Sequence, residues 1–250
     1  MIRVKQVSRP DYLSPEKVGE LTRTFINSNK TKRVWSSEKI KEQLINSSNG
    51  KCVYCESNIS EESKYMEVEH FKCKDLYPED VVTWSNLLAS CKRCNGIKSN
   101  HDVCSEPIIN PYSDNPNKHL KLKIARFKAI DTLGKNTIDV LQLNDFQRLV
   151  RRRGILVLSL DDNLEELKII ANRFSQGQDP GDRRKLITKC KGLLSECQPS
   201  KEYSGIMATT LLHSTDFNEV KVVLEQNDFW DSELSELYQH CVNISFDICE

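Results

Sequence analysis

Two short cysteine pairs constrain the fold of this chain more than any other feature of its sequence. Cys52 and Cys55 form one C-x2-C pair, and Cys91 and Cys94 form a second pair after 35 intervening residues. A knuckle of this kind turns the chain so that two thiolates point at one position, and two knuckles supply the four sulfur ligands of a tetrahedral zinc site. We therefore expect one structural Zn²⁺ on these four cysteines.

Ten cysteines occur in the chain, and its first ten residues contain no apolar signal-peptide core. Cysteines in such a chain are typical of metal ligation or free thiols rather than disulfides. The six cysteines outside the two pairs have no comparable spacing, so we expect them to be buried or free thiols. A thioredoxin-like redox role for one C-x2-C pair is the alternative, but neither pair lies in a βαβ pattern.

Length and hydropathy fit a protein without membrane spans. The chain has 250 residues, of which 38% are hydrophobic, and this length suits one large domain or two modest ones. Its longest strongly apolar stretch, residues 154–160, is far shorter than the roughly 20 residues that span a bilayer. We therefore expect a soluble, cytoplasmic bacterial protein that does not contact a membrane.

Opposite charge excesses divide the neutral chain. Residues 1–153 carry 27 Lys and Arg against 19 Asp and Glu, and residues 154–250 carry 9 against 17, which gives formal charges of +8 and −8. A basic first part suits a polyanionic ligand, and an acidic second part suits another surface such as a basic protein. Chance segregation of solvated faces is the alternative.

Local patterns predict short elements around the cysteine pairs. A helix with Ser14 as its N-cap is predicted to run to about Asn27, and a second helix is predicted over Ser37–Asn46. Alternating side chains predict a short strand over Tyr65–His70, and Trp84–Ala89 is interpreted as the approach to a helix.

The rest of the chain is predicted to be mainly helical. Leu120–Ile130 fits a strand pair or, almost as well, a helix. Asn144 is expected to cap a long helix that continues through Ile170 and is interrupted or kinked near Gly154. Further helices are predicted over Arg183–Glu196, Tyr203–His213, Phe217–Glu225 and Ser232–Cys241.

Four polar residues stand between or beside the cysteine pairs at a recognisable spacing. Glu69 and His70 end the predicted strand, Asn86 precedes the second pair, and Asn95 directly follows Cys94. With the cysteine pairs, this pattern resembles the HNH nuclease family over about residues 50–100. The resemblance implies a ββα-metal fold with an acidic residue and a histidine on the first strand, an asparagine before the helix, and a His or Asn on the helix.

The same resemblance implies a role for each of these residues. His70 is expected to be the general base, Glu69 and Asn95 to hold the catalytic metal, and Asn86 to fix the loop that orients His70. Phosphodiester hydrolysis needs a base for the attacking water and a divalent cation to neutralise charge on the phosphate. The sequence has Glu where the family more often has Asp, and Asn where it often has His. These oxygen ligands favour Mg²⁺ or Mn²⁺ over a catalytic zinc.

Some of these assignments stay open. Adjacent residues of a regular strand face opposite sides, so the strand must end, twist or bulge if Glu69 and His70 are to reach one phosphate. Glu67 shares a face with Glu69 and is the alternative ligand. His101 and His119 are tempting extra ligands, but a histidine near a loop is more often a hydrogen-bonded structural residue.

Basic and aromatic residues surround the motif. Several cations could line a phosphate track, although each one by itself is more simply a solvated surface residue. Those nearest the motif are Lys72, Lys74, Lys92, Arg93 and Lys98. Trp35 and Trp84 stand among apolar helix-forming positions, so we expect them in the core rather than as base-stacking platforms.

A wider resemblance gives the motif an anti-phage context. Residues 69–72, 76–78, 84–95 and 106–111 look like the HNH subunits of Septu-type defence systems, the PtuB-like family, including those attached to retrons. The resemblance implies a partner ATPase of the ABC/SMC-like kind, PtuA, and a substrate that is DNA or an RNA such as tRNA. A retron reverse transcriptase with its nucleic acid is a further candidate partner.

Together these features predict an α+β, mostly helical fold, in which a ββα-metal HNH core with a four-cysteine zinc site precedes an α-helical domain. We expect an extended arm over 1–13, N-terminal helices over 14–48, the nuclease core and its following loop over 49–131, and a partner-docking helical domain over 132–250. The alternative function is a non-catalytic zinc module that binds nucleic acid, or an adaptor that tethers the ATPase.

Overall fold

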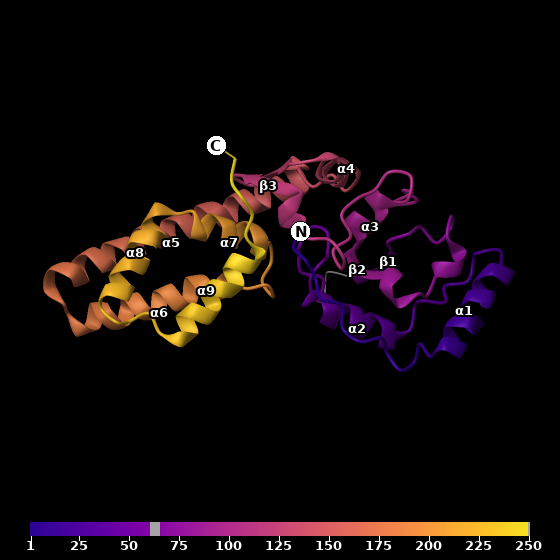
Figure 1. Ribbon diagram of the computed structural model, residues 1–250, viewed down its shortest axis with the longest axis horizontal. Coiled ribbons are helices and arrows are strands. Elements are labelled where there is room, and N and C mark those ends of the chain that lie inside the picture. The colour runs from indigo at the N-terminus through magenta and orange to yellow at the C-terminus, as the bar shows by residue number, and fades with distance from the viewer. Residues whose placement is uncertain (61–65, 250) are drawn as a thin grey trace. The chain divides into compact units, whose positions relative to one another are not determined.

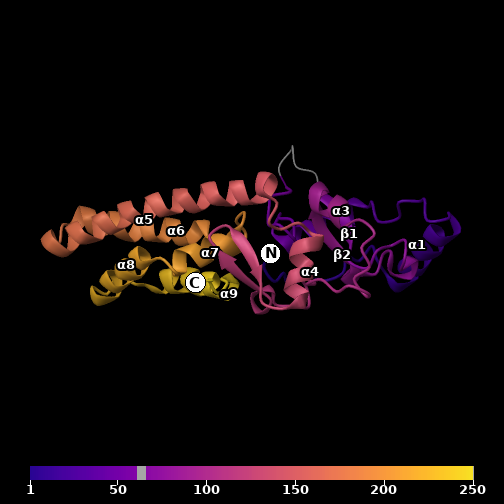
Figure 2. The same ribbon diagram turned by 90° about the horizontal axis from the view of Figure 1, so that it is seen from above.

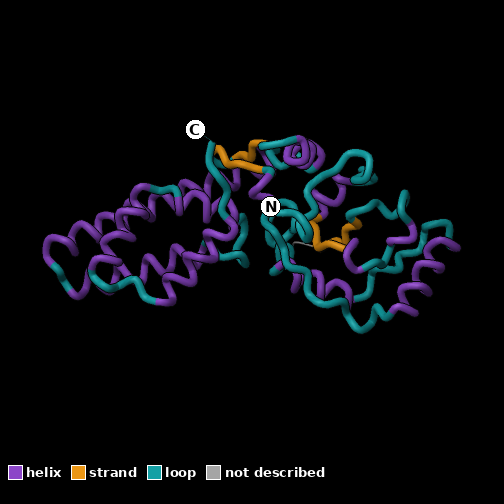
Figure 3. Tube along the Cα trace, viewed as in Figure 1, coloured by secondary structure: helices purple, strands orange, loops and turns teal. Residues whose placement is uncertain are grey.

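The computed structural model describes residues 1–60 and 66–249, in which the chain forms two compact units (Figure 1). Unit 1 comprises Met1–His119 and Ala129–Leu143, and unit 2 comprises Leu120–Lys128 and Asn144–Glu250. Much of unit 1 is loop, whereas unit 2 is mainly helical (Figure 3). The first residue of the strand expected over 65–70 lies outside the described residues.

The two predicted N-terminal helices are confirmed. Helix α1 spans Pro15–Asn27, and the Ser14 side chain caps it by accepting a hydrogen bond from the backbone N–H of Lys17 at 3.2 Å. Pro15 has no backbone N–H, so no donor is left unpaired at the first helical position, which explains why the helix begins there. Helix α2 spans Glu38–Ser48 and ends at a left-handed residue, Asn49.

The segment before α1 contains no helix or strand, yet it packs into unit 1. Met1 and Ile2 are buried. The Val4 N–H donates to the carbonyl of Pro111 at 2.8 Å, and the Trp84 indole N–H donates to the carbonyl of Val7 at 2.9 Å. This arm is therefore part of the first unit's packing.

A strand pair followed by a short helix lies at the centre of unit 1. Strand β1, Met66–His70, pairs antiparallel with β2, Leu87–Cys91, with His70 opposite Leu87. Helix α3, Lys92–Lys98, follows β2 directly. The expected helix approach over 84–89 is wrong from Leu87 onward, because residues 87–90 are all buried in a strand. A strand buried on both faces lacks the alternation that distinguishes it from a buried helix segment.

Unit 1 also contains a helix that no local pattern singled out, at the start of the region expected to be the helical domain. Helix α4 spans Thr132–Val140, and the Asp131 side chain caps it by accepting from the Gly134 N–H at 2.8 Å. A Cβ atom at Gly134 would lie 2.1 Å from the carbonyl oxygen of His119. Glycine is therefore required for this close approach of the helix to the loop.

The ambiguous segment after His119 is a strand pair rather than a helix. Strand β3, Leu120–Lys123, pairs with β4, Arg126–Ala129. The Leu122 N–H also donates to the backbone carbonyl of Asp247, and the Leu122 carbonyl accepts from the Cys249 N–H, both at 2.8 Å. The end of the chain thus supplies backbone partners that no local pattern reveals.

The expected cap of the long helix is wrong, and the expected interruption lies a few residues before Gly154. Asn144 instead binds the backbone of Phe127, accepting from its N–H at 2.9 Å and donating to its carbonyl at 2.8 Å. Asp145 caps a π-helical turn over residues 146–150 by accepting from the Arg148 N–H at 2.9 Å. Helix α5, Arg151–Gly177, then runs through Gly154 without a break, so the irregularity lies before the glycine.

Four further helices complete unit 2 and match the predicted ones within a few residues. They are α6 (Pro180–Glu196), α7 (Ser204–Leu212), α8 (Thr215–Gln226) and α9 (Ser232–Ile244). Helix α5 packs against α6 and α8, and α7 packs against α9 (Figures 1 and 2). Helix α7 is buried almost all round, so it forms the centre of this helical unit.

The predicted fold class is confirmed: the chain is α+β and mostly helical, with small strand pairs and a four-cysteine cluster. Within the described ranges, no helix combines the length and the apolar character that a membrane span requires.

Candidate functional site

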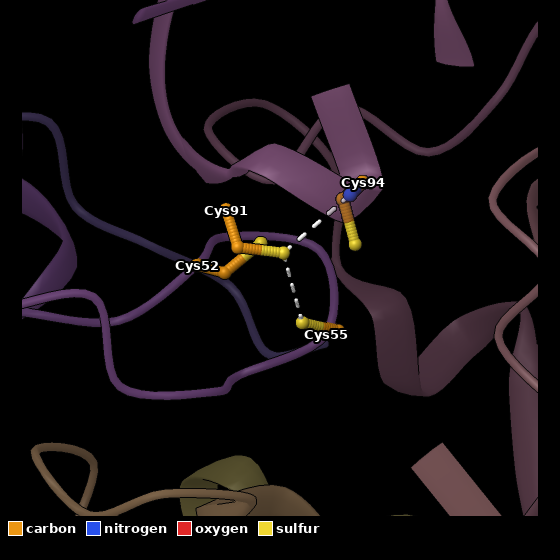
Figure 4. A group of neighbouring side chains, drawn as sticks. All are labelled: Cys52, Cys55, Cys91 and Cys94. Carbon is orange, nitrogen blue, oxygen red and sulfur yellow. Dashed lines mark hydrogen bonds between the residues drawn. The ribbon is translucent and has the colours of Figure 1, made fainter. Parts of the chain in front are cut away.

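The two cysteine pairs converge on one point in unit 1. The Sγ atoms of Cys52, Cys55, Cys91 and Cys94 all lie within 4.8 Å of one another (Figure 4). The loop that carries Cys52 and Cys55 is held to β2 by a hydrogen bond from the Val53 N–H to the Ala89 carbonyl at 3.0 Å. The cluster therefore joins this loop to the start of α3.

The spacing of these sulfurs fits a zinc ion. Tetrahedral zinc with Zn–S bonds of about 2.3 Å needs sulfurs roughly 3.8 Å apart, and the Sγ atoms of Cys55 and Cys91 are 3.8 Å apart. Burial raises the pKa of the Cys52 thiol, so thiolates gathered here need a cation beside them. The four cysteines could hold a zinc ion. Within the described residues they are the one group of three or more Cys, His, Asp or Glu placed to do so.

Unit 1 also contains a cavity of about 540 Å³. It is lined by β1, by α3 and by the segment between α1 and α2. Four of the polar residues singled out in the sequence line it: Glu67, Glu69, His70 and Asn95. Strand β1 ends at His70, and both Glu69 and His70 border this one cavity although they are adjacent in the strand.

His70 is held in one orientation at the cavity wall. Its Nε2 atom lies 2.9 Å from the carbonyl oxygen of Val81, and an edge-on contact joins its ring to Trp35 with 4.7 Å between ring centroids. A carbonyl can only accept, so the Val81 contact places the ring proton on Nε2 and leaves a lone pair on Nδ1. The side chain is 7% exposed, and burial lowers its pKa from 6.5 to about 4.

Glu69 is a buried carboxylate with a buried cation beside it. Its Oε1 atom lies 2.7 Å from the Nζ atom of Lys98, and Lys98 also donates to the carbonyl of His70 at 2.9 Å. Burial raises the pKa of Glu69 from 4.5 to about 7, against the opposing effect of the Lys98 ammonium. Lys98 thus ties α3 to the end of β1.

Asn95 and Glu67 both line the cavity and are hydrogen-bonded to each other. The Asn95 Nδ2 atom donates to Glu67 Oε2 at 2.5 Å, which leaves the Asn95 Oδ1 oxygen as the atom available to a cation. Glu67, Glu69 and Asn95 together present oxygen ligands of the kind that Mg²⁺ and Mn²⁺ prefer.

Asn86 does not line the cavity, but it fixes the loop behind His70. Its Oδ1 accepts from the Lys72 N–H at 2.7 Å, and its Nδ2 donates to the carbonyls of Lys72 and Asp80, both at 3.1 Å. Asp80 directly precedes Val81, whose carbonyl holds His70. A buried amide therefore connects the two ends of the loop that orients the imidazole.

His101 and His119 lie outside the cavity lining. The Nε2 of His101 lies 2.7 Å from the carbonyl of Glu106, and the Nδ1 of His119 lies 2.6 Å from Asp131 Oδ2. Both histidines therefore hold loops together through local hydrogen bonds.

Comparison with known proteins decides the family. No family model matches the chain. It is 42% identical over 239 residues to a Septu protein PtuB of Bacillus thuringiensis, an alignment that covers 95% of this chain and 92% of that protein. The chain belongs to the PtuB family. A second Septu protein PtuB, from Bacillus mycoides strain KBAB4, is 29% identical over 188 residues, which cover 58% of this chain and 62% of that relative.

Membership of the PtuB family supports a role as a subunit in Septu anti-phage defence. In this PtuB family member, the sequence did not reveal the roles of Lys98 and Arg33. Lys98 was considered as a surface or phosphate-track cation, whereas it is 1% exposed. Arg33 lines the cavity from a segment that precedes the motif. Trp35, expected in the core, is only half-buried, because the same segment places it at the cavity wall. The fixed Cys94-to-Lys98 spacing on one helix could have revealed Lys98, since residues four apart share a face.

Proposed function

We propose that this PtuB family member is a metal-dependent HNH endonuclease that hydrolyses phosphodiester bonds of nucleic acid. The observation that carries the proposal is His70, buried at the wall of a cavity with its Nε2 against a backbone carbonyl. Glu67, Glu69 and Asn95 border the same cavity. A positioned imidazole beside oxygen ligands is the combination that phosphodiester hydrolysis requires.

His70 would act as the general base through Nδ1. Its pKa of about 4 keeps the imidazole neutral near pH 7, so the lone pair can accept a proton from the attacking water. The Val81 carbonyl holds the opposite nitrogen and stabilises the imidazolium that forms. An incoming phosphate anion also favours that charged form.

Glu69 and Asn95 would hold a divalent cation, with Glu67 as the alternative carboxylate ligand. Such an ion would neutralise charge on the phosphate and on the departing oxygen. Lys98 already neutralises part of the Glu69 charge, and it fixes the carboxylate at the end of β1. The zinc cluster would act at a distance, because it anchors α3, on which Asn95 and Lys98 stand.

The test of the nuclease is cleavage of DNA and RNA pools by the zinc-containing full chain in Mg²⁺. His70→Ala should abolish cleavage and leave zinc content and fold intact, because only the base is lost. His101→Ala is the matched control and should cleave as the wild type does. If His70→Ala keeps most of the activity, the base is misassigned, and loss of activity in His101→Ala would then identify the other histidine.

We further propose that the chain works with an ABC/SMC-like ATPase of the PtuA kind. The support is family membership together with the acidic excess after residue 153. Exposed Glu165 on α5 is suited to such a contact, since its carboxylate makes no ion pair within the described residues. Glu166 and Glu233 already pair with Lys189 and Lys191. Copurification with the neighbouring gene product, with and without a retron reverse transcriptase, tests these partners.

A further inference from the structure

The segment between α1 and α2 supplies one wall of the His70 cavity. Lys30, Arg33, Trp35 and Lys41 all come from this stretch or the start of α2, and they border the same cavity as Glu67, Glu69 and His70. This stretch lies before the first cysteine pair, outside the residues that carry the HNH resemblance. We call Lys30, Arg33, Trp35 and Lys41 the substrate wall.

The cations of this wall differ in whether an acidic side chain already pairs with them. Lys41 pairs with Glu38 at 2.6 Å, and Lys30 donates to the carbonyl of Asp75 at 2.6 Å. Arg33 is exposed, and its guanidinium makes no ion pair within the described residues. Lys74 borders the same cavity, and its ammonium lies beside the Trp35 ring of the wall. Arg33 is therefore the cation of the wall best suited to donate hydrogen bonds to a phosphate.

Trp35 borders the cavity and is held in place by its contacts with neighbouring rings. The contacts with Phe25 and His70 are edge-to-face, with interplanar angles of 74° and 86°. In the described part of the chain no aromatic ring stacks on its faces, and the Lys74 ammonium lies over its ring at 5.7 Å. The indole is half-buried. A fixed aromatic face among cations is the arrangement on which an unstacked base rests.

The dimensions of the site limit what can reach His70. The imidazole is 7% exposed and stands at the wall of a cavity of about 540 Å³, which lies in the range of roughly 300–1,000 Å³ typical of small-ligand sites. A paired and stacked base cannot lie on Trp35 while its phosphate reaches His70. A flexible strand with one base turned out can satisfy both contacts.

We infer that the substrate wall binds single-stranded nucleic acid, with Trp35 stacking one base and Arg33 holding a phosphate next to the bond that is cut. The inference rests on the proposed nuclease function and specifies its substrate class. Lys30, whose contact is a backbone carbonyl, adds a positive charge along the strand. Sequence preference is weak in such a site, because stacking tolerates any base.

Binding is tested apart from cleavage, in the full-length zinc-containing chain carrying His70→Gln. The probes are labelled single strands of about 12 nucleotides, as DNA and as RNA, and the matching duplexes. Arg33→Glu should weaken single-strand binding roughly tenfold at about 0.15 M salt and reduce its salt dependence. Lys39→Glu is the matched control: it makes the same change of sign at an exposed residue of α2 outside the cavity lining, and its affinity should stay near the wild type's.

Stacking has its own readout. With Trp84→Phe and Trp230→Phe, Trp35 is the remaining tryptophan of the three in the chain, and a single strand should quench its fluorescence. Trp35→Leu should weaken binding roughly fivefold or more, and Trp35→Phe should retain most of the affinity.

Each outcome separates this inference from the nuclease proposal. If the wild type cleaves while the Arg33 and Trp35 variants bind like Lys39→Glu, the substrate wall is refuted and the nuclease stands. If single strands bind and quench Trp35 but no variant or wild type cleaves in Mg²⁺, the wall stands and the nuclease proposal fails. If single strands do not bind, or if the duplexes bind more tightly without quenching Trp35, the inference that the substrate wall binds single strands is refuted.

Discussion

Acidification should change the stability contributions of His70 and Glu69 in opposite directions, because burial shifts the pKa values of the two groups in opposite directions. Burial lowers the pKa of His70 from 6.5 to about 4 and raises that of Glu69 from 4.5 to about 7. As the pH falls, His70 is protonated in the unfolded chain before it is protonated in the folded chain. The free energy of unfolding is therefore highest above pH 6.5 and falls as the pH drops toward 4. The folded chain protonates Glu69 first, so stability rises as the pH falls from 7 toward 4.5.

These pKa values set the size of the effect. Between about pH 7 and pH 5, His70 removes about 2 kcal/mol from the free energy of unfolding and Glu69 adds about 2 kcal/mol, so the two cancel in the wild type. His70→Gln keeps an amide donor for the Val81 carbonyl and should gain about 2 kcal/mol on acidification relative to the wild type. Glu69→Gln should lose about 2 kcal/mol. The unpaired Lys98 ammonium in that variant lowers stability at both pH values and leaves the difference unchanged.

Urea unfolding at pH 7, 6 and 5 in Mg²⁺-free buffer with zinc retained measures these differences. A Trp230→Phe background restricts tryptophan fluorescence to Trp35 and Trp84, which both belong to unit 1. His101→Gln is the control, since it changes a histidine outside the cavity. If His70→Gln and Glu69→Gln show parallel pH dependence, the burial and pairing assigned to the two groups are wrong.

Four further outcomes follow from the described contacts. Cys91→Ser should lose one zinc per chain by elemental analysis and unfold unit 1 at ordinary temperature, because binding of a structural zinc is coupled to folding. Asn86→Ala leaves backbone groups of the 72–80 loop unpaired and should lower the free energy of unfolding by about 1–3 kcal/mol and slow cleavage, with zinc content unchanged; full activity would contradict its positioning role. Asn95→Ala should raise the Mg²⁺ concentration needed for half-maximal cleavage, whereas an unchanged Mg²⁺ titration would remove Asn95 from the ligand set. Glu165→Lys should weaken copurification with the ATPase more at low salt than at high salt, and equal loss at both would argue against an electrostatic contact.

Several parts of the fold could be predicted from local residues. Ser14 and Pro15 mark the start of α1 because the cap and the missing N–H act within one turn. The helices of unit 2 follow from apolar spacing in the same way. The C-x2-C spacing brings two sulfurs together inside each knuckle, whatever the rest of the chain does.

Other parts were decided by contacts between distant residues. Asn144 was a reasonable helix cap by type, but the backbone of Phe127 offered it two hydrogen bonds and Asp145 took the cap instead. Strand β2 was mistaken for the approach to a helix because burial on both faces removed its alternation. In each case a partner many residues away replaced the local preference.

The candidate site shows the same division. By itself the sequence singled out four cysteines, because their spacing limits the chemistry that they can support. The resemblance to HNH nucleases added Glu69, His70, Asn86 and Asn95. Only the tertiary structure decided that Lys98 pairs with Glu69, that Asn86 ties down the loop behind His70, and that Arg33 and Trp35 face the same cavity. Burial, and the pKa shifts that come with it, depend on how segments far apart in the chain pack together, and no local pattern of residues encodes that packing.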